Sequence, residues 1–416
     1  MRHDWPIKEL GDICRVIGGA TPSKNREYFY KGIIPWATVR DMCHDIISET
    51  EFMITEDAVR SCSTNIIPAN NVVIATRVGL GKICYIARDT AINQDLRGVI
   101  PIKQKELSTR FLFWWFKSIA HLIEQEGTGA TVQGVKLPFI KSLRIPVPPL
   151  PVQKRIVAIL DEAFEGIDTA IANAEKNLAS ARDLLERCMS SAFDRQSDTR
   201  SLTVRELAAQ DRGSIRTGPF GSQLLHGEFV DAGIAVLGID NVVENRFAWN
   251  RRRYITAEKY ASLRRYTVKS GDVLISIMGT CGRCAIVPND IEPAINSKHL
   301  CCISLDRTKC LPDYLHAYFL FHPLARAYLS SQSKVSIMDG LNMGIIQEMP
   351  VLVPPLVQQK AIAELFERAR LASNRLADIQ TGKIALFRDL RQAILGKAFA
   401  GELTVQPEKT LPEAAE

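Results

Sequence analysis

The residues of this chain that most readily suggest chemistry are cysteines. Cys281 and Cys284 are separated by two residues, and His299, Cys301 and Cys302 follow closely. Cysteine and histidine near one another could bind zinc or form a Cys/His nucleophile. The second pair is adjacent, however, which suits tetrahedral coordination poorly. The pattern therefore favours small core residues on strands, with a zinc site and a nucleophilic cysteine as the alternatives.

The motifs that hold phosphate or nucleotide cofactors are missing from the sequence. A phosphate-binding loop needs a glycine where Thr76 stands and a hydroxyl where Ile83 follows Gly81-Lys82. The Pro-Pro pairs precede leucine, whereas an amino-methyltransferase motif has an aromatic residue there. No Gly-x-Gly-x-x-Gly opens a helix after a strand. We therefore expect no catalytic residue, no bound metal and no cofactor in this chain.

Basic and amide side chains in predicted loops are the residues that we expect to contact nucleic acid. Arg, Lys, Asn and Gln suit base edges, while most basic side chains meet phosphates. In the first half of the chain the candidates are Lys24, Arg26, Arg40, Arg77, Lys82, Arg97 and Lys136. In the second half they are Arg216, Ser222, Gln223, Asn241, Arg251, Arg252, Arg253, Arg264, Arg265, Lys298 and Lys334. Each could instead be an ordinary solvated surface residue.

The overall composition is that of a globular protein. The chain has 416 residues, is 46% hydrophobic and 24% charged, and carries a formal net charge of +6. This mild basic excess permits nucleic-acid binding without requiring it. No apolar run follows residues 1–6, and the apolar segment 111–116 is too short to span a bilayer. We therefore predict a cytoplasmic protein with reduced cysteines and no membrane contact.

A repeat defines the elements that carry these groups. The segment PPLPVQK at 148–154 returns as PPLVQQK at 354–360, and the offset of 354 − 148 = 206 residues persists through the sequence that follows. Apolar residues then recur about every 3.5 positions, the period of a coiled coil. The pattern predicts two long helices, within 148–197 and 354–403, whose seams pack antiparallel with a globular domain at each end. The alternative is that each helix covers only its own domain.

The two predicted seams differ in purity. Ser373, Gln380 and Arg391 interrupt the second seam, and polar residues at such positions can fix the register of a helix pair. Each helix would be roughly 65 Å long at 1.5 Å per residue. The residues that we predict to pair the helices are Ile156, Leu160, Ile167, Leu178, Leu185, Ile362, Phe366, Leu376, Ile384, Phe387 and Ile394.

The segments 1–147 and 198–353 are predicted to be similar α/β domains, related by a pseudo-two-fold internal repeat. Apolar runs at 72–76, 83–87, 273–277 and 284–287 predict strands, and the aromatic segments 111–116 and 314–321 predict buried helices. Residues 7–10 resemble 204–207, and 91–94 resemble 294–297. Between these anchors the halves diverge, which favours two modules with different targets. Residues 404–416 are predicted to be a flexible tail.

This arrangement resembles the specificity subunit of type I restriction-modification enzymes. The resemblance covers essentially the whole chain and is carried by 145–150 with Gln153, by 351–356 with Gln359, and by 397–403. It implies a non-catalytic subunit in which each target-recognition domain reads one half of a split double-stranded DNA sequence. The paired helices would set the spacer and dock two methyltransferase subunits. Lys154 departs from the family, which more often has an acidic residue beside this glutamine.

The resemblance also implies where the chemistry lies. S-adenosylmethionine would bind the methyltransferase partners, and ATP and magnesium would bind endonuclease-translocase subunits that join the larger complex. Two other interpretations stay open. The chain could be the specificity component of another multisubunit DNA-modifying complex, or a self-contained hydrolase or nuclease. The missing cofactor motifs argue against the last.

Overall fold

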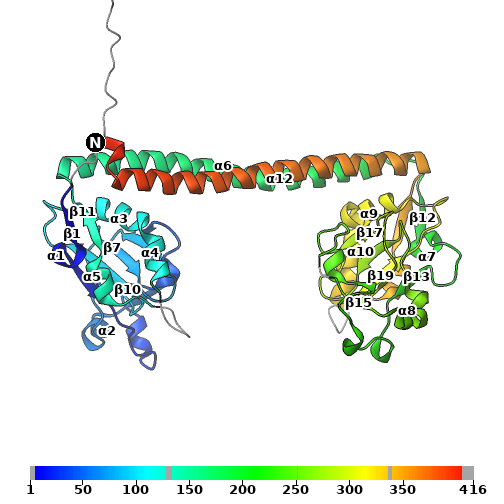
Figure 1. Cartoon of the computed structure of the whole chain (residues 1–416), viewed down its shortest axis with the longest axis horizontal. Helices are drawn as coiled ribbons and strands as arrows, with labels where there is room; N and C mark the ends of the chain where they lie inside the picture. The colour runs from blue at the N-terminus through cyan, green and yellow to red at the C-terminus, as the bar shows by residue number, and fades with distance from the viewer. Residues whose placement is uncertain (1–4, 128–133, 251, 336–339, 405–416) are drawn as a thin grey trace, which may run out of the picture. The chain divides into compact units, whose positions relative to one another are not determined.

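The computed structural model describes residues 5–127, 134–250, 252–335 and 340–404, and it divides into two compact units. The first unit is Met1–Glu175 with Gly382–Glu416, and the second is Lys176–Thr381. Each unit contains a globular domain together with a segment of two long helices, α6 (Leu150–Asp194) and α12 (Leu356–Phe399) (Figure 1). The predicted tail lies outside the described residues except for Thr404.

The described residues of the first globular domain form three sheets. Their strand orders are β2-β10-β7-β8-β4, β5-β3-β9-β6 and β1-β11. Most neighbours are antiparallel, but β3 pairs parallel with β9 and β4 with β8. The strands are β1 (Ile7–Glu9), β2 (Cys14–Gly18), β3 (Ile34–Ala37), β4 (Ile46–Ile47), β5 (Phe52–Ile54), β6 (Ile66–Ile67), β7 (Val72–Ala75), β8 (Ile83–Ile86), β9 (Thr90–Ile92), β10 (Leu96–Pro101) and β11 (Arg144–Pro146).

The aromatic helix of this domain is buried on all sides. The helices are α1 (Leu10–Ile13), α2 (Glu56–Ser61), α3 (Thr109–Ser118), α4 (Ala120–Gln125) and α5 (Leu137–Ser142). Helix α3 packs on β7 and β8, and Trp114 also contacts Phe164 of α6 with ring centroids 4.8 Å apart. A helix that is apolar all round needs partners on every side. None of the described helices is long and apolar enough to cross a membrane.

The second globular domain repeats this plan. Its sheets have the orders β13-β19-β16-β17, β15-β14-β18 and β12-β20. The strands are β12 (Arg200–Thr203), β13 (Ile215–Thr217), β14 (Ile234–Leu237), β15 (Tyr254–Ile255), β16 (Val273–Ser276), β17 (Cys284–Ile286), β18 (Ala294–Asn296), β19 (Leu300–Ile303) and β20 (Pro350–Val353). The helices are α7 (Val204–Leu207), α8 (Ala257–Leu263), α9 (Pro312–Phe321), α10 (Pro323–Val335) and α11 (Met343–Gln347).

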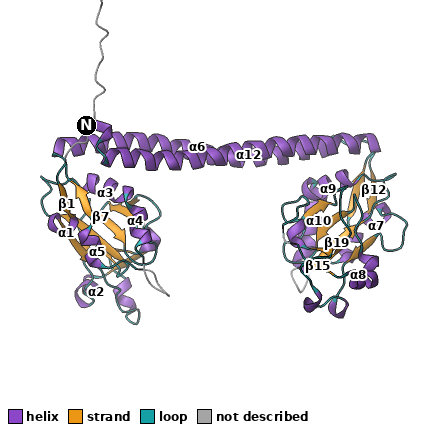
Figure 2. Cartoon of the chain, in the orientation of Figure 1, coloured by secondary structure: helices purple, strands orange, loops and turns teal. Residues whose placement is uncertain are grey.

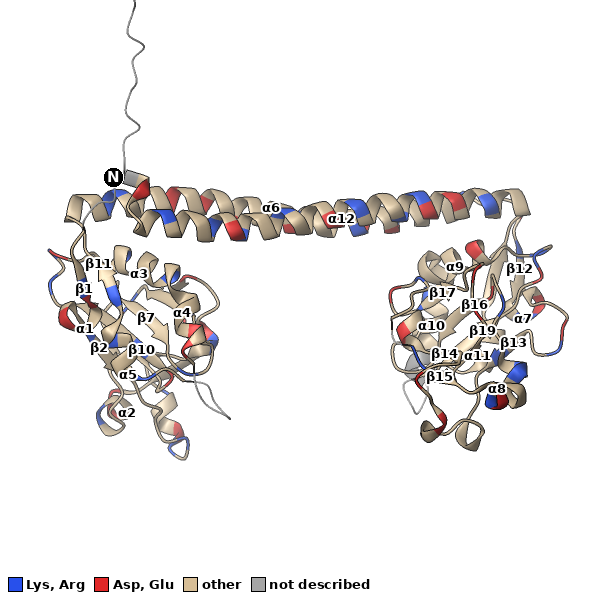
Figure 3. Ribbon diagram, in the orientation of Figure 1, with Lys and Arg blue, Asp and Glu red and all other residues tan. Residues whose placement is uncertain are grey.

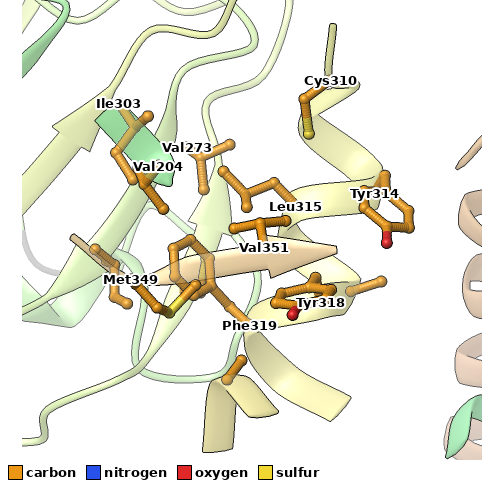
Figure 4. Close-up of a cluster of buried hydrophobic side chains, with 14 of the residues drawn as sticks. Val204, Val273, Ile303, Cys310, Tyr314, Leu315, Tyr318, Phe319, Met349 and Val351 are labelled. Carbon is orange, nitrogen blue, oxygen red and sulfur yellow. The ribbon is translucent and has the colours of Figure 1, made fainter. Parts of the chain in front are cut away.

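These elements confirm the α/β prediction for both domains (Figure 2). All four predicted strands and both aromatic helices are present, with ends that differ by a residue or two. Tyr314 and Tyr318 of α9 lie in the core of the second domain, as Figure 4 shows together with Val273, Ile303 and Val351 from the strands. The equivalent aromatic helix therefore organises the core in each domain.

The long helices pair antiparallel within each unit. In the first unit, Arg391 of α12 forms an ion pair with Asp168 of α6 at 2.6 Å. In the second unit, the hydroxyl of Ser373 donates to the carbonyl oxygen of Ala181 at 3.0 Å. Two of the polar residues that interrupt the apolar seam are therefore used as contacts between the helices. Both helices carry Lys and Arg as well as Asp and Glu along their lengths (Figure 3).

Most predicted seam residues are buried, but one prediction is wrong. Leu376 is 42% exposed, because Ala377 takes the seam position between Ser373 and Gln380. The steps from Ser373 are therefore four and then three residues, where the sequence suggested three and then four. The buried seam residues are Ile156, Leu160, Ile167, Ile362, Phe366 and Ile384, and the partly buried ones are Leu178, Leu185, Phe387 and Ile394.

A buried glutamine ties the start of each long helix to its domain. The Gln153 amide donates to the carbonyls of Glu106 and Pro148, both at 2.8 Å, and accepts from the Ser108 N–H at 2.9 Å. Gln359 makes the same three bonds in the second unit, at 2.8 to 2.9 Å. Both glutamines are 0% exposed. The repeated glutamine is therefore a structural clamp between the loop before the aromatic helix and the first turn of the long helix.

Backbone hydrogen bonds correct one match between the halves. The N–H of Leu10 donates to the carbonyl of Leu143 at 2.8 Å, and the N–H of Val204 donates to the carbonyl of Met349 at 3.1 Å. Leu143 and Met349 are equivalent by the repeat offset, so Leu10 corresponds to Val204. The predicted match with Leu207 is wrong by three residues, because it aligned similar letters from a strand and a helix.

Candidate nucleic-acid interface

The surface of the first domain has a groove with a volume of about 850 Å³, which we call the first groove. The loop after β2, the 3₁₀ helices η1 (Glu27–Tyr30) and η2 (Val39–Asp41), and the turn between β9 and β10 supply its walls. The lining residues are Thr21, Lys24, Glu27, Tyr30, Lys31, Trp36, Thr38, Val39, Arg40, Phe52, Val78, Asn93, Gln94 and Asp95.

The first groove combines an aromatic floor with a basic rim. The rings of Tyr30, Trp36 and Phe52 meet edge to face, with centroids 5.9 to 6.3 Å apart. The Tyr30 hydroxyl and the Trp36 indole N–H are already bonded to loop carbonyls, at 2.7 and 3.2 Å. Lys24 and Arg40 are exposed, and the ion pair between the Arg40 guanidinium and Glu51 is long, at 3.4 Å. These cations remain accessible to an anionic ligand.

The surface of the second domain has a groove with a volume of about 590 Å³, which we call the second groove. It lies between the loop after β13, strand β14 and the turn between β18 and β19. Its lining residues are Pro219, Leu224, His226, Phe229, Val230, Asp231, Val236, Arg252, Arg253, Ser297, Lys298 and His299. Cations outnumber carboxylates here, so the surface suits a polyanion.

The basic groups of the second groove differ in how they are held. Arg253 pairs with Asp240 at 2.8 Å, and the Arg252 guanidinium lies 4.8 Å from the centroid of the Trp249 ring. Lys298 is exposed and has no hydrogen bond or ion pair with the described residues. Burial, together with the charges of Lys298 and Arg253, lowers the pKa of His299 below its usual range. His299 is therefore neutral at pH 7.

Each groove is bordered by a turn, and the two turns are equivalent in the two domains. The turns 93–96 and 297–300 are each closed by a bond from the N–H of the last residue to the carbonyl of the first, at 3.3 and 3.1 Å. The second residue of the turn is Gln94 in the first domain and Lys298 in the second. The two side chains therefore occupy equivalent backbone positions.

This equivalence corrects a second match from the sequence. The N–H of Asn93 donates to the carbonyl of Ala37 at 3.0 Å, and the N–H of Ser297 donates to that of Leu237 at 2.8 Å. Asn93 therefore corresponds to Ser297, although the sequence matched it with Asn296. The loop after the first strand of each main sheet passes so close to this region that a Cβ on Gly19 or Gly218 would lie about 2 Å from a carbonyl oxygen.

Two predicted contact residues lie in the protein interior. Arg216 is 9% exposed and pairs with Asp272 at 2.8 Å, and its guanidinium also donates to the Thr267 carbonyl at 2.6 Å. Asn241 is 2% exposed and donates to the carbonyl of Ala248 at 2.8 Å. Both side chains are occupied by structural bonds, so we leave them out of the proposed interface.

The other candidates are spread over the two domains. Lys24 and Arg40 line the first groove, and Arg252, Arg253 and Lys298 line the second. Exposed residues outside the linings are Arg26, Arg77, Lys82, Lys136, Ser222, Gln223, Arg264 and Arg265. Arg97 is half-buried, and burial and the charge of Arg77 lower its pKa. Arg251 and the side chain of Lys334 lie outside the described residues.

The cysteines do not gather around one point. Cys284 and Cys301 face the same core, flanking Ile275 across the sheet, whereas Cys302 faces the opposite core. Burial raises the pKa of Cys301 to about 12, which leaves the thiol protonated. The described residues hold no group of three or more His, Cys, Asp or Glu arranged for a metal ion. The geometry favours the interpretation as core residues.

Sequence reasoning missed the aromatic floor of the first groove and Gln94, although it did predict Lys298 at the equivalent turn position. Trp36 and Tyr30 gave no periodic signal, and Gln94 was noticed only as part of a repeated segment. The one available signal was the position of Gln94 in a short polar segment between two apolar strands, where a turn is expected.

Comparison with known proteins identifies a family. Residues 2–178 and 243–378 match the model of the type I restriction modification DNA specificity domain. The specificity subunit of the Escherichia coli type I restriction enzyme EcoR124I/EcoR124II is 34% identical over 203 residues, which are 44% of this chain and 48% of the relative. That alignment thus spans about half the length of the relative. The MjaVIII specificity subunit of Methanocaldococcus jannaschii is 20% identical over 97% of this chain and 94% of its own length.

Solved structures share the fold. A chain from a study of complex assembly and conformational transition in the type I R-M system matches with a TM-score of 0.76 at 18% identity, covering 96% of this chain and 98% of that one. The HsdS subunit from Thermoanaerobacter tengcongensis matches with a TM-score of 0.56 at 18% identity, covering 96% and 97% of the two chains.

Proposed function

The chain belongs to the family of type I restriction-modification DNA specificity proteins, and we propose that it is the subunit that reads DNA for such a complex. Each globular domain binds one half of a bipartite target in double-stranded DNA. The single observation that carries this proposal is the pair of grooves, which border equivalent turns but have different linings. A shared scaffold with two different surfaces suits two different half-sites.

The groove linings support DNA as the ligand. Exposed Lys and Arg side chains can neutralise phosphates, and amides and hydroxyls can pair with base edges. The first groove supplies Lys24, Arg40 and Gln94, and the second supplies Arg252 and Lys298. Most protein contacts to DNA go to the backbone, so we expect the arginines and Lys24 to position the duplex and a smaller set to specify sequence.

In this proposal the chain supplies no chemistry of its own. Two methyltransferase subunits bind S-adenosylmethionine and transfer the methyl group, and endonuclease-translocase subunits use ATP and magnesium. The long helices α6 and α12 dock the methyltransferase subunits. Exposed positions of these helices carry charges of both signs, which a protein partner can complement.

We also propose that the helix pair sets the length of the unspecified spacer between the half-sites. Inserting one matched heptad into each helix would lengthen the pair by about 10 Å at 1.5 Å per residue. That corresponds to about three base pairs of DNA at ~3.4 Å each. A spacer longer by about three base pairs in the recognised motif is the expected result. An active complex with an unchanged spacer would contradict this role.

The test of the proposed function is methylation mapping. The chain is co-expressed with the methyltransferase encoded beside it, and modified bases are located by single-molecule sequencing. Methylated adenines in one split motif, lost when this chain is omitted, are expected. An active, folded methyltransferase that modifies no split motif would favour a specificity component of another DNA-modifying complex.

A further inference from the structure

The second residue of the groove-bordering turn differs in chemistry between the domains. It is Gln94 in the first and Lys298 in the second, although the surrounding backbone bonds are the same. Thr76 N–H donates to the carbonyl of the next turn residue, Asp95, at 2.8 Å, and Ile277 N–H donates to that of His299 at 2.9 Å. Backbone hydrogen bonds therefore hold the turn on both sides. A substitution at its second residue changes the side chain that the groove presents and leaves the backbone of the turn in place.

The Gln94 side chain is oriented and still has bonding capacity. Its carbonyl oxygen accepts from the hydroxyl of Thr21, and its amide nitrogen donates to the carboxylate of Asp95 at 3.3 Å. A carboxamide has two acceptor lone pairs and two donor hydrogens. One of each is therefore left for a ligand, which is the pair that adenine N6 and N7 require in the major groove.

Lys298 offers only donors. Its ammonium group is exposed in the second groove and unpaired among the described residues, whereas Arg253 beside it is held by Asp240. An ammonium group suits two adjacent acceptors, and guanine presents O6 and N7 on one edge. Because the Lys298 ammonium group can only donate, it distinguishes guanine from adenine, whose N6 is itself a donor.

We propose that Gln94 and Lys298 are equivalent specificity-determining residues, with Gln94 reading an adenine in one half-site and Lys298 reading a guanine in the other. This inference rests on the proposed function, since it assumes that the grooves bind DNA. It adds that a single turn position sets one base in each half-site. The neighbouring arginines hold the backbone and contribute equally to all sequences.

The test exchanges the two side chains. Gln94→Lys and Lys298→Gln are each co-expressed with the methyltransferase, and the methylated motifs are mapped. Gln94→Lys should lower methylation at the original motif by about tenfold or more and move the preference at one position of one half-site from adenine to guanine. Lys298→Gln should cause the reverse change in the other half-site. Gln104→Lys and Lys269→Gln, exposed residues outside the grooves, are matched controls that should leave the motif unchanged.

The outcomes separate the inference from the function. A split motif for the native chain that Gln94→Lys and Lys298→Gln both leave intact would overturn the inference and retain the function. A change in both half-sites from one substitution would also overturn it. Absence of any split motif for the native chain would overturn the function itself. If a folded variant methylates nothing, DNA selected by its purified complex from a pool randomised in that half-site gives the same readout of base preference.

Discussion

At the scale of single residues, the buried glutamines Gln153 and Gln359 each join a long helix to its domain through three hydrogen bonds. Replacing Gln153 with Ala removes three hydrogen bonds and leaves the Ser108 N–H and two carbonyls buried without that partner. A buried unsatisfied group costs about 1–3 kcal/mol. We expect Gln153→Ala to lower the free energy of unfolding by about 3 kcal/mol in urea titrations. The exposed neighbour Lys154→Ala should change it by less than about 0.5 kcal/mol. Equal losses for the two variants would show that the clamp is dispensable.

Two buried histidines, His316 and His322, and the partly buried His299 make the stability of the second unit depend on pH. Burial lowers the pKa of His299, His316 and His322 below their usual 6.5. The unfolded chain therefore binds protons that the folded chain does not, and stability falls as pH drops below about 6.5. The His316 ring nitrogen Nε2 contacts the carbonyl of Cys284 at 3.0 Å, a bond that a glutamine amide could donate. We expect His316→Gln to reduce the loss of stability between pH 7.5 and about 5.5, measured by urea unfolding. An identical pH profile for the variant would contradict this assignment.

At the scale of elements, the long helices are stabilised by one buried face each. Leu395 of α12 is 2% exposed in the core of the first unit, whereas Leu386 on the same helix is 68% exposed. Leu395→Ala should cost about 2–5 kcal/mol in the free energy of unfolding, and Leu386→Ala should cost far less. The two variants remove the same atoms, so thermal or urea unfolding isolates the effect of burial. Similar costs would mean that the buried face of α12 is not where the structure has it.

The same helices show which structural features could be predicted from the sequence and which could not. Helix positions, the aromatic helices and the strand pattern followed from the apolar period and the repeat. The phase of the second seam did not, because between polar Ser373 and Gln380 the large apolar residue nearest the 3.5-residue spacing is Leu376. An α-helix also drifts against a strict 3.5-residue repeat, so a small alanine can hold the seam where a leucine seems to fit.

The grooves were the least predictable feature. Their lining residues are distant in sequence, and polar turn residues such as Gln94 resemble those of any surface loop. Arg216 was predicted as a contact because it was assigned to a loop, but it lies on β13, and its pairing with Asp272 in the interior depends on tertiary structure. Matching the two halves by letters also failed at 7–10, where the hydrogen bonds set a different register.

At the scale of the whole molecule, each unit joins one globular domain to segments of both helices. Leu395 and Ala398 near the end of the chain pack in the same core as Phe111 and Leu160. The first domain therefore needs the last helix for its stability. An exchange of its recognition surface should keep α6 and α12 intact.

The central claim is that each domain reads its own half-site, and a domain exchange tests it most directly. Residues 1–147 are replaced by the corresponding domain of another family member, both long helices are kept, and methylated motifs are mapped with the same methyltransferase. We predict a motif in which one half-site is new and the other half-site is unchanged. A chimera that changes both half-sites, or that keeps the original motif, would contradict it.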